Sequence, residues 1–253
     1  MKLKDRVAIV TGSGSGIGRA IALAMAREGA RVAVVDLNEV GAQETVKEIQ
    51  KEGGQAHPYK ADITKKAQID AMVADVIKRW GTVHILVNNA RWDKVEPFIQ
   101  STEETWDKVL AINLKGPIIC TRAVLDEMLK KSYGKIVSIA SDAGRVGSTG
   151  EAVYAGTKGA IIAFSKTLAR EMARHHITVN VVCPGLTETP LLQGIRAQSP
   201  KAEKVIEAVT RAIPLGRVGQ PEDIAGAVVY LASPAADFVT GQTLSVSGGL
   251  TMA

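Results

Sequence analysis

The apolar positions along the chain form short continuous runs that alternate with segments of helical periodicity. Five runs rich in β-branched residues predict buried strands, at Val7–Val10, Arg31–Val35, Ile85–Val87, Lys135–Ile139 and Thr178–Val182. Two weaker runs predict further strands, at Gln55–Lys60 and Thr243–Val246. Between the runs, apolar residues recur on one helix face, which predicts helices that include Gly18–Glu28, Val40–Glu52, Gln68–Trp80, Glu103–Leu129 and Ala155–Arg174.

The order of these elements predicts the fold class. Continuous apolar strands separated by helices are typical of a parallel sheet with helices on both faces. Because crossovers between parallel strands are right-handed, we expect an α/β fold with a doubly wound parallel sheet. No internal repeat or low-complexity linker interrupts the pattern, so residues 1–253 are expected to form a single domain. Ligands of such sheets bind at the carboxyl ends of the strands, where we therefore expect the functional side chains.

Composition narrows the class of protein. Charged residues make up 23% and aromatic residues only 4%, and the net charge of +5 includes no dense basic run. This argues against a nucleic-acid partner. No apolar stretch approaches the about 18 residues of a membrane span, and the N-terminus has no secretory signal. Cys120 and Cys183 lie in apolar segments without metal-ligand spacing, so we expect free thiols, no metal site and a cytoplasmic protein.

A glycine-rich segment follows the first predicted strand directly. It reads Thr11-Gly-Ser-Gly-Ser-Gly-Ile-Gly18, with glycines at positions 12, 16 and 18. Glycine lets the backbone turn tightly and approach a pyrophosphate closely, and the following helix presents free N–H groups and a partial positive charge. The segment predicts a dinucleotide-binding domain of the Rossmann type.

The second predicted strand ends at Asp36, about 20 residues beyond this loop. A carboxylate at this place accepts hydrogen bonds from the ribose hydroxyls of the adenosine half and repels a 2′-phosphate. The alternative is an aspartate that only caps the next helix or its turn. No basic residue follows immediately, because Leu37 and Asn38 come next, and this favours NAD over NADP.

Candidate catalytic residues follow the predicted strand Lys135–Ile139. Ser141 comes two residues after its end, and Tyr154 and Lys158 open a helix at i, i+4 spacing, which places them on one face. An ammonium about 4 Å from the phenol, at an effective dielectric near 20, would stabilise the phenolate by roughly 4 kcal/mol. We therefore expect Lys158 to lower the pKa of Tyr154 enough for acid–base catalysis, while Ser141 binds the same substrate oxygen.

These segments together resemble the short-chain dehydrogenase/reductase family. The matching pieces span the chain in the family's order: TGSGSGIG, Asp36, Asp62-Ile63, Asn88-Asn89-Ala90, Asn113, Ser141, YAGTK at 154–158, and Pro184-Gly185. The resemblance implies that Tyr154 exchanges the proton with the substrate, that Lys158 lowers its pKa and binds the nicotinamide ribose, and that Ser141 orients the carbonyl. Asn113 would hold a water that continues the proton relay.

The same resemblance implies a set of residues that bind the cofactor. The glycine segment would hold the phosphates through Gly12, Ser15, Gly16, Ile17 and Gly18. Asp62 and Ile63 would contact adenine, and Asn89 would lie beside the adenosine ribose. Pro184 and Gly185 would lead into Thr187 and Thr189, which would meet the nicotinamide carboxamide and the phosphates.

One position departs from the family pattern. The family has Asn-Asn-Ala-Gly at the end of the fourth strand, and this chain has Arg91 in place of the glycine. A side chain there is expected to strain the turn and to place a guanidinium near the cofactor cleft. The alternative is that Arg91 points to solvent.

A closer resemblance bears on the substrate. Segments such as ITVNVVCPG and the pair Trp92-Asp93 are similar to 2-hydroxycyclohexanecarboxyl-CoA dehydrogenases, which implies a β-hydroxyacyl-CoA substrate. A substrate lid is expected near 190–212, with basic residues suited to CoA phosphates, or simply facing solvent: Arg196, Lys201, Lys204 and Arg211. Two other functions remain open, a 3-oxoacyl-(acyl-carrier-protein) reductase and a non-catalytic NAD-binding sensor.

The C-terminus bears on assembly. The segment Leu250–Ala253 carries no charged side chain, and such a tail is better buried than exposed to water. The family resemblance implies tetramers with two-fold axes, so we expect a homotetramer. The alternative is that the tail folds back on its own subunit.

Overall fold

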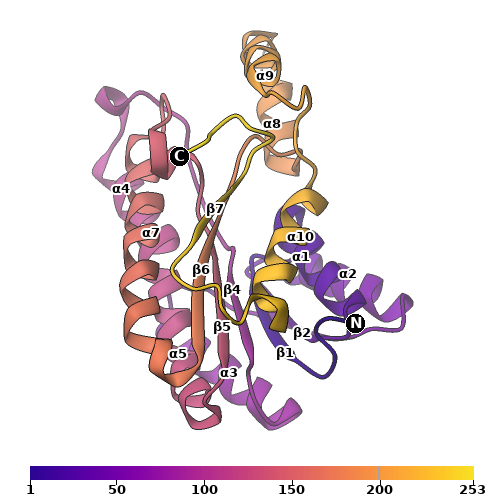
Figure 1. Cartoon of the computed structure of the whole chain (residues 1–253). Coiled ribbons are helices and arrows are strands. Elements are labelled where there is room, and N and C mark those ends of the chain that lie inside the picture. Colours follow the sequence, from indigo (N-terminus) through magenta and orange to yellow (C-terminus); the bar gives the residue numbers. More distant parts are fainter. Residues whose placement is uncertain (199) are drawn as a thin grey trace.

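In the computed structural model, which describes residues 1–198 and 200–253, a parallel sheet lies between two layers of helices (Figure 1). The sheet has seven strands in the order β3-β2-β1-β4-β5-β6-β7. Their bounds are β1 Val7–Thr11, β2 Arg31–Asp36, β3 Gln55–Lys60, β4 Ile85–Asn88, β5 Gly134–Ile139, β6 Ile177–Pro184 and β7 Thr243–Val246. Every predicted strand is present within two residues of its predicted ends, and the predicted fold class is confirmed.

The strand order reverses beside β1. From β1 the chain runs outward to β2 and β3, then crosses back to β4 on the other side of β1 and continues to β7. Val10 pairs with Val34 of β2 on one side and with Val87 of β4 on the other. The loops that follow β1 and β4 therefore run in opposite directions at the carboxyl edge of the sheet. Doubly wound folds bind their ligands at this place.

Three helices cover each face of the sheet, and each layer buries an apolar core. On one face lie α1 Gly16–Arg27, α2 Glu39–Lys51 and α10 Pro221–Ala232. On the other lie α3 Lys66–Trp80, α5 Gly116–Lys131 and α7 Ala152–Met172. Strand residues alternate between the two cores, so Val32 and Val34 of β2 face one layer and Ala33 and Val35 the other.

The long helix expected at Glu103–Leu129 is not continuous. It divides into α4 Glu103–Leu110, a π-helical segment η2 Ala111–Lys115, and α5. Pro117 at the start of α5 has no N–H, so the carbonyl of Asn113, four residues earlier, lacks its helical donor. Such π-helical turns occur mostly at functional sites. The hydrophobic periodicity runs through the break, which is why the sequence pattern predicted one helix.

Two helices project beyond the carboxyl edge of the sheet, α8 Pro190–Gln198 and α9 Pro200–Ala212 (Figure 1). They coincide with the expected lid near 190–212. Residue 199 and the side chain of Lys201 lie outside the described residues. Within the described part of the chain, no helix has the length and apolar character needed to cross a bilayer.

Candidate active site

The loop after β1 is shaped by close backbone contacts. Gly12 has a φ of +64°, and a Cβ there would lie 2.6 Å from the Cα of Ala90. A Cβ on Gly18 would lie 2.1 Å from the carbonyl oxygen of Gly12. Both distances are far too short for a side chain, so the loop can close onto the start of α1 only with glycine at these two positions.

The end of β4 anchors this loop. The Asn89 amide nitrogen donates to the carbonyl oxygens of Thr11 and Gly12, both at 2.9 Å. The Thr11 hydroxyl accepts from the backbone N–H groups of Asn89 and Ala90, at 3.0 and 3.2 Å. Asn89 therefore supports the loop, and its expected contact with the adenosine ribose stays a prediction. Thr11 was not predicted as a site residue, although a polar residue at the end of an apolar strand is a usable signal.

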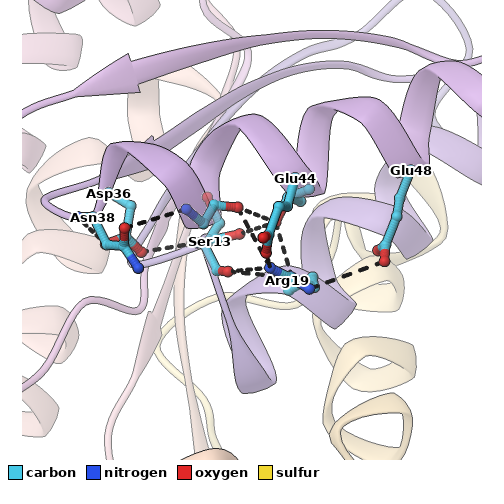
Figure 2. Close-up of polar contacts among 9 residues, drawn as sticks. Ser13, Arg19, Asp36, Asn38, Glu44 and Glu48 are labelled. Atoms are coloured by element: carbon cyan, nitrogen blue, oxygen red, sulfur yellow. Dashed lines mark hydrogen bonds and ion pairs between the residues drawn. The ribbon is translucent and has the colours of Figure 1, made fainter.

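Asp36 stands at the end of β2 against the same loop (Figure 2). Its Oδ2 accepts from the Gly14 N–H at 2.8 Å and its Oδ1 from the Asn38 N–H at 2.9 Å. Asn38, whose side chain accepts from Gly41 N–H, is the residue that caps α2. Capping of α2 therefore does not explain Asp36. The bond from the Asn38 N–H is that of a turn aspartate, as the alternative expects, and the ribose role stays a prediction.

Arg19, in the first turn of α1, was not singled out from the sequence. Its guanidinium donates to the Gly14 carbonyl oxygen at 2.6 Å and pairs with Glu44 at 2.9 Å and Glu48 at 3.9 Å (Figure 2). The sequence signal is a basic residue at a helix N-terminus, where the helix dipole disfavours a free cation. Two carboxylates of α2 offset its charge, so this arginine is not a free cation at the cofactor site.

The residues expected around adenine lie at the end of β3, next to Asp36. The Ala61 N–H donates to the Asp36 carbonyl oxygen at 3.2 Å. The Asp62 carboxylate accepts from the N–H and hydroxyl of Thr64, at 2.9 and 2.7 Å. Ile63 is buried, and its Cδ1 lies 2.5 Å from where Gly116 would carry a Cβ. An apolar side chain, Ile63, and a polar one, Asp62, thus lie beside Asp36.

The segment after β6 closes the other side of the glycine loop. Pro184 ends β6, and the Gly185 N–H donates to Val246 at 3.0 Å. The Thr187 hydroxyl donates to the Gly185 carbonyl oxygen at 3.0 Å, and Thr189 accepts from the Leu192 N–H at 3.3 Å at the start of α8. The Thr189 methyl group is 3.6 Å from a Cβ built on Gly16, so Thr189 faces the glycine loop, and the expected cofactor contact of Thr187 stays a prediction.

The start of α1 completes this part of the site. Ser15 occupies the N-cap position, is exposed and makes no capping hydrogen bond. Ile17 packs against the first core, which holds the helix N-terminus in place. The glycine loop has no space for side chains, and the N-terminus of α1 lies behind it. This arrangement fits the pyrophosphate of a nicotinamide dinucleotide, and the residues from Gly12 to Gly18 would hold that pyrophosphate.

Ser141, Tyr154 and Lys158 gather at the carboxyl end of β5. Tyr154 and Lys158 are buried on one face of α7. The Lys158 ammonium donates to the Ile139 carbonyl oxygen at 2.8 Å, and its Nζ lies 5.5 Å from the centre of the Tyr154 ring. The Ser141 hydroxyl oxygen accepts from the Ala143 N–H at 3.2 Å, which leaves its own proton for another acceptor. The predicted trio is therefore brought together.

The electrostatics of this trio differ from the expectation. Burial, followed by the charge of Arg91, lowers the pKa of Lys158 to about 7. Burial raises the pKa of Tyr154, whereas Arg91 and the Ser141 hydroxyl lower it and Glu151 and Asp93 raise it further. Lys158 is not among the groups that lower the pKa of Tyr154, so its expected effect on the phenol stays a prediction. Burial favours the neutral amine of Lys158, and a neutral amine does not stabilise a phenolate.

Asn113 lies in the π-helical segment and is fully buried. Its side chain accepts from the Trp92 N–H at 2.9 Å and donates to the Trp92 carbonyl oxygen at 2.6 Å. The side chain therefore fixes the loop after β4. The backbone carbonyl, which has no N–H of Pro117 as a donor, is a candidate to hold a water.

Arg91 lies between the two anchored residues Ala90 and Trp92. It is not among the residues with positive φ, so the expected strain of the turn is wrong. The side chain is exposed and forms no ion pair with any described residue. Its charge nevertheless lowers the pKa of both Tyr154 and Lys158. Arg91 is therefore an exposed cation in the neighbourhood of Tyr154 and Lys158. Among residues 1–198 and 200–253, no cluster of metal-ligating side chains was found.

Comparison with known proteins places these features in a family. A family model described as "Enoyl-(Acyl carrier protein) reductase" matches residues 12–251. Sorbitol dehydrogenase of Cereibacter sphaeroides is 40% identical, with 98% of each chain covered. A 3-oxoacyl-(acyl-carrier-protein) reductase of Thermotoga maritima is 37% identical over 100% of both chains. Human (3R)-3-hydroxyacyl-CoA dehydrogenase is 36% identical, covering 99% of this chain and 97% of the relative.

Solved structures agree with these relatives. A 7α-hydroxysteroid dehydrogenase complexed with NADH and 7-oxo glycochenodeoxycholic acid has a TM-score of 0.92 and 35% identity, covering 98% of this chain and 95% of the other. An actinorhodin polyketide ketoreductase with NADPH has a TM-score of 0.92 and 39% identity, covering 97% of each chain. Because these matches run through both the glycine loop and the Tyr154 helix, the chain belongs to the short-chain dehydrogenase/reductase family, as an oxidoreductase that acts on CH–OH groups with a nicotinamide cofactor.

Proposed function

We propose that the chain oxidises the secondary alcohol of a β-hydroxyacyl-CoA to the ketone, with NAD as the hydride acceptor. The observation that carries this proposal is the placing of Ser141, Tyr154 and Lys158 at the end of β5, beside the glycine loop. An acid–base group and a hydrogen-bond donor for one substrate oxygen thus stand next to a dinucleotide site.

The chain's residues divide the chemistry as follows. The bound nicotinamide ring supplies the acceptor for the hydride that leaves the carbinol carbon. Tyr154 takes the proton from the substrate hydroxyl through its phenolate oxygen, and Ser141 donates a hydrogen bond to the same substrate oxygen. Lys158 would bind the nicotinamide ribose, and the Asn113 carbonyl would hold the water that carries the proton away. In the reverse direction, Tyr154 returns the proton to the ketone oxygen.

Two features of the site, a carboxylate and a paired arginine, support NAD over NADP. The Asp36 carboxylate stands where the adenosine ribose is expected and would repel a 2′-phosphate. Arg19, the cation beside the loop, is paired with Glu44 and Glu48 and is therefore not free to bind a phosphate. The related structures include one with NADH and one with NADPH, so the preference of this chain is inferred from its own residues.

The substrate class rests on the relatives and on the lid. Relatives are named for hydroxyacyl-CoA and for acyl-carrier-protein substrates. Helices α8 and α9 would form a lid over the site. Lys204 and Arg211 are exposed there and suited to CoA phosphates, whereas Arg196 is paired with Glu188 at 2.7 Å and is less available. The side chain of Lys201 lies outside the described residues.

A second function, reduction of a 3-oxoacyl-(acyl-carrier-protein), uses the same catalytic residues and is supported by the Thermotoga maritima relative. Asp36 disfavours it, because it weighs against NADPH. A non-catalytic NAD-binding sensor has little support, because such a protein has no need of Ser141, Tyr154, Lys158 and Asn113 together.

One kinetic screen separates the three functions. Purified protein is mixed with NAD or NADP and β-hydroxyacyl-CoA thioesters, or with NADH or NADPH and 3-oxoacyl thioesters, including an acyl-carrier-protein thioester, with sorbitol as a further alcohol. Turnover of CoA thioesters with NAD is expected. Turnover only of the carrier-protein thioester with NADPH would favour the second function, and tight NAD binding without turnover would favour the sensor.

We further propose a cytoplasmic homotetramer. Cys120 and Cys183 are free and buried, which suits a reducing compartment.

A further inference from the structure

Several charged groups besides Lys158 surround Tyr154. A narrow cavity beside Tyr154 is lined by Asp93 and Glu151, and Arg91 precedes Asp93 by two residues. Glu151 is the residue directly before α7, three positions ahead of Tyr154. One cation and two carboxyl groups thus stand around the phenol, and neither Asp93 nor Glu151 has a part in the proposed proton transfer.

The backbone at Arg91 is held on both sides. Before it, the Ala90 N–H donates to the Thr11 hydroxyl, and the Cα of Ala90 presses on Gly12. After it, the buried Asn113 amide bonds both the N–H and the carbonyl oxygen of Trp92. The backbone of Arg91 is therefore fixed close to the ends of β4 and β5, where Ser141 and Tyr154 lie, and its exposed side chain extends from there.

The other elements around Tyr154 carry little free charge. In the loop after β4, Lys94 and Glu96 pair with each other at 2.6 Å. Helix α4 contributes to the cavity three side chains without charge, Thr105, Trp106 and Val109, while its Lys108 lies 4.0 Å from the centre of the Trp92 ring. Glu151 directly before α7 and Lys158 within it are the charged groups on this side, and the end of β5 contributes the neutral Ser141.

The two cations near the phenol differ in how firmly they hold their charge. Burial lowers the pKa of Lys158 to about 7, so this amine loses its charge near neutral pH. An arginine side chain stays charged at every pH at which proteins are stable. Burial and the neighbouring Glu151 raise the pKa of Asp93 to about 7, so Asp93 gains a negative charge over the range in which Lys158 becomes neutral.

We propose that Arg91 is a positioning residue whose permanent positive charge stabilises the phenolate of Tyr154, and that Asp93 and Glu151 oppose it. These three residues set the pH range in which Tyr154 acts as a base. The inference rests on the proposed function, in which Tyr154 accepts the substrate proton. It assigns a role to the one position at which the sequence departs from the family's Asn-Asn-Ala-Gly motif.

The test compares Arg91→Met, which removes the charge but keeps a long side chain, with Arg91→Lys, which restores the charge. The phenolate of Tyr154 is titrated by its ultraviolet absorbance in the free protein, as the difference from the same variant carrying Tyr154→Phe. We expect the midpoint to move to higher pH in Arg91→Met, to return in Arg91→Lys, and to move to lower pH in Glu151→Gln. Lys158 does not disturb this reading, because its amine loses its proton before the phenol does.

Kinetics provide the second measurement. Below the pH midpoint of kcat/KM for alcohol oxidation, Arg91→Met should lower kcat/KM by about three-fold, the size of a unit charge acting over several ångströms in water. Arg174→Met is the matched control, because it removes an exposed arginine beyond the far end of α7 and should change nothing.

The outcomes separate this inference from the proposed function. Unmoved phenolate and kinetic midpoints in Arg91→Met, or an acid shift, would overturn the inference, and a raised KM with unmoved midpoints would show instead that Arg91 holds a ligand. Absence of any NAD-dependent turnover in the unaltered protein would refute the proposed function while the phenolate titration still decides the role of Arg91.

Discussion

At the scale of single residues, the carboxylate of Asp36 has two tasks. It accepts the Gly14 N–H and the Asn38 N–H, which ties the glycine loop to the end of β2. Each carboxylate oxygen has a second lone pair, and these remain for the ribose hydroxyls. Replacing Asp36 therefore loosens the loop as well as removing a negative charge, so cofactor preference is better measured as a ratio than as a rate.

The first prediction concerns that ratio. Asp36→Ala combined with Leu37→Arg should move the preference from NAD toward NADP, because the repulsion of the 2′-phosphate is removed and a cation is added. The measurement is kcat/KM for each cofactor. Asp70→Ala, which removes a carboxylate of α3 that pairs with Lys66, is the control and should leave the ratio unchanged. Equal kcat/KM values for NAD and NADP in the unaltered protein would contradict the proposed role of Asp36.

The second prediction concerns Tyr154 and Lys158. Tyr154→Phe should lower kcat by about 10²–10⁴-fold, the usual contribution of a general acid or base, and leave NAD affinity within a few-fold. Lys158→Ala should lower both kcat and the affinity for NAD, because Lys158 would lower the pKa of Tyr154 and would bind the nicotinamide ribose. Steady-state kinetics and NAD titration of the free protein check the two variants. A Tyr154→Phe protein that keeps more than about a tenth of the rate would contradict proton transfer by Tyr154.

At the scale of elements, the contact between the glycine loop and α1 leaves no space for side chains. Gly18 faces the Gly12 carbonyl oxygen and the Asn89 amide, at 2.1 and 2.5 Å from a Cβ. Gly226, in the middle of α10, is exposed and has no neighbour within 4 Å of a Cβ. These two helical glycines therefore offer a matched pair for substitution.

The third prediction uses this pair. Gly18→Ala should destabilise the protein by about 1–3 kcal/mol, as overpacking does, and should weaken NAD binding because the loop must move. Gly226→Ala should stabilise it by about 0.5–1 kcal/mol, since alanine favours the helix and nothing obstructs it. Denaturant unfolding and NAD titration measure both effects. If the two variants were equally stable, the close contact at Gly18 would not constrain the loop.

The π-helical segment shows how one element serves another. Its Asn113 side chain bonds the backbone of Trp92 in the loop after β4, and Pro117 keeps a donor away from the Asn113 carbonyl. The break in the helix thus both holds the loop that carries Arg91 and frees a carbonyl oxygen at the site. In a continuous helix without the proline, a backbone N–H of the same helix would donate to that carbonyl oxygen. The oxygen would then not be available to a water.

At the scale of the whole molecule, several apolar groups are exposed. Strand β7 is an edge of the sheet, and Leu244 on it is 41% exposed. Leu110 and Ile118, on α4 and α5, are exposed by 43% and 38%. In the tail, Leu250 and Thr251 bond back to Ser247, while Met252 is 82% exposed. The fold-back thus covers only part of the tail. An unpaired edge and apolar helix faces are surfaces that subunits commonly cover.

The fourth prediction is therefore a homotetramer with two-fold symmetry. Sedimentation equilibrium should give four subunits, and deleting Leu250–Ala253 should weaken assembly. Val40→Ser, which removes an exposed apolar side chain of α2, is the control and should leave assembly unchanged. A monomer at micromolar concentration would contradict the prediction.

The sequence by itself determined the features that depend on neighbouring residues. Continuous apolar runs predicted the five central strands, because a strand buried on both faces has no polar side to show, and weaker runs predicted the edge strands β3 and β7. The glycine loop and the Tyr154–Lys158 pair were also predicted, since a turn and an i, i+4 spacing are set within a few residues.

Only the tertiary structure decided the features that join distant segments. Three contacts link residues 20 or more positions apart in the chain: the bond from Asn113 to Trp92, the pairing of Arg19 with α2, and the grouping of Arg91 and Asp93 with Tyr154. The pKa directions of Tyr154 and Lys158 follow from burial, which depends on the whole fold. Local spacing sets which groups can meet, whereas packing sets the dielectric and the neighbours that decide their charge.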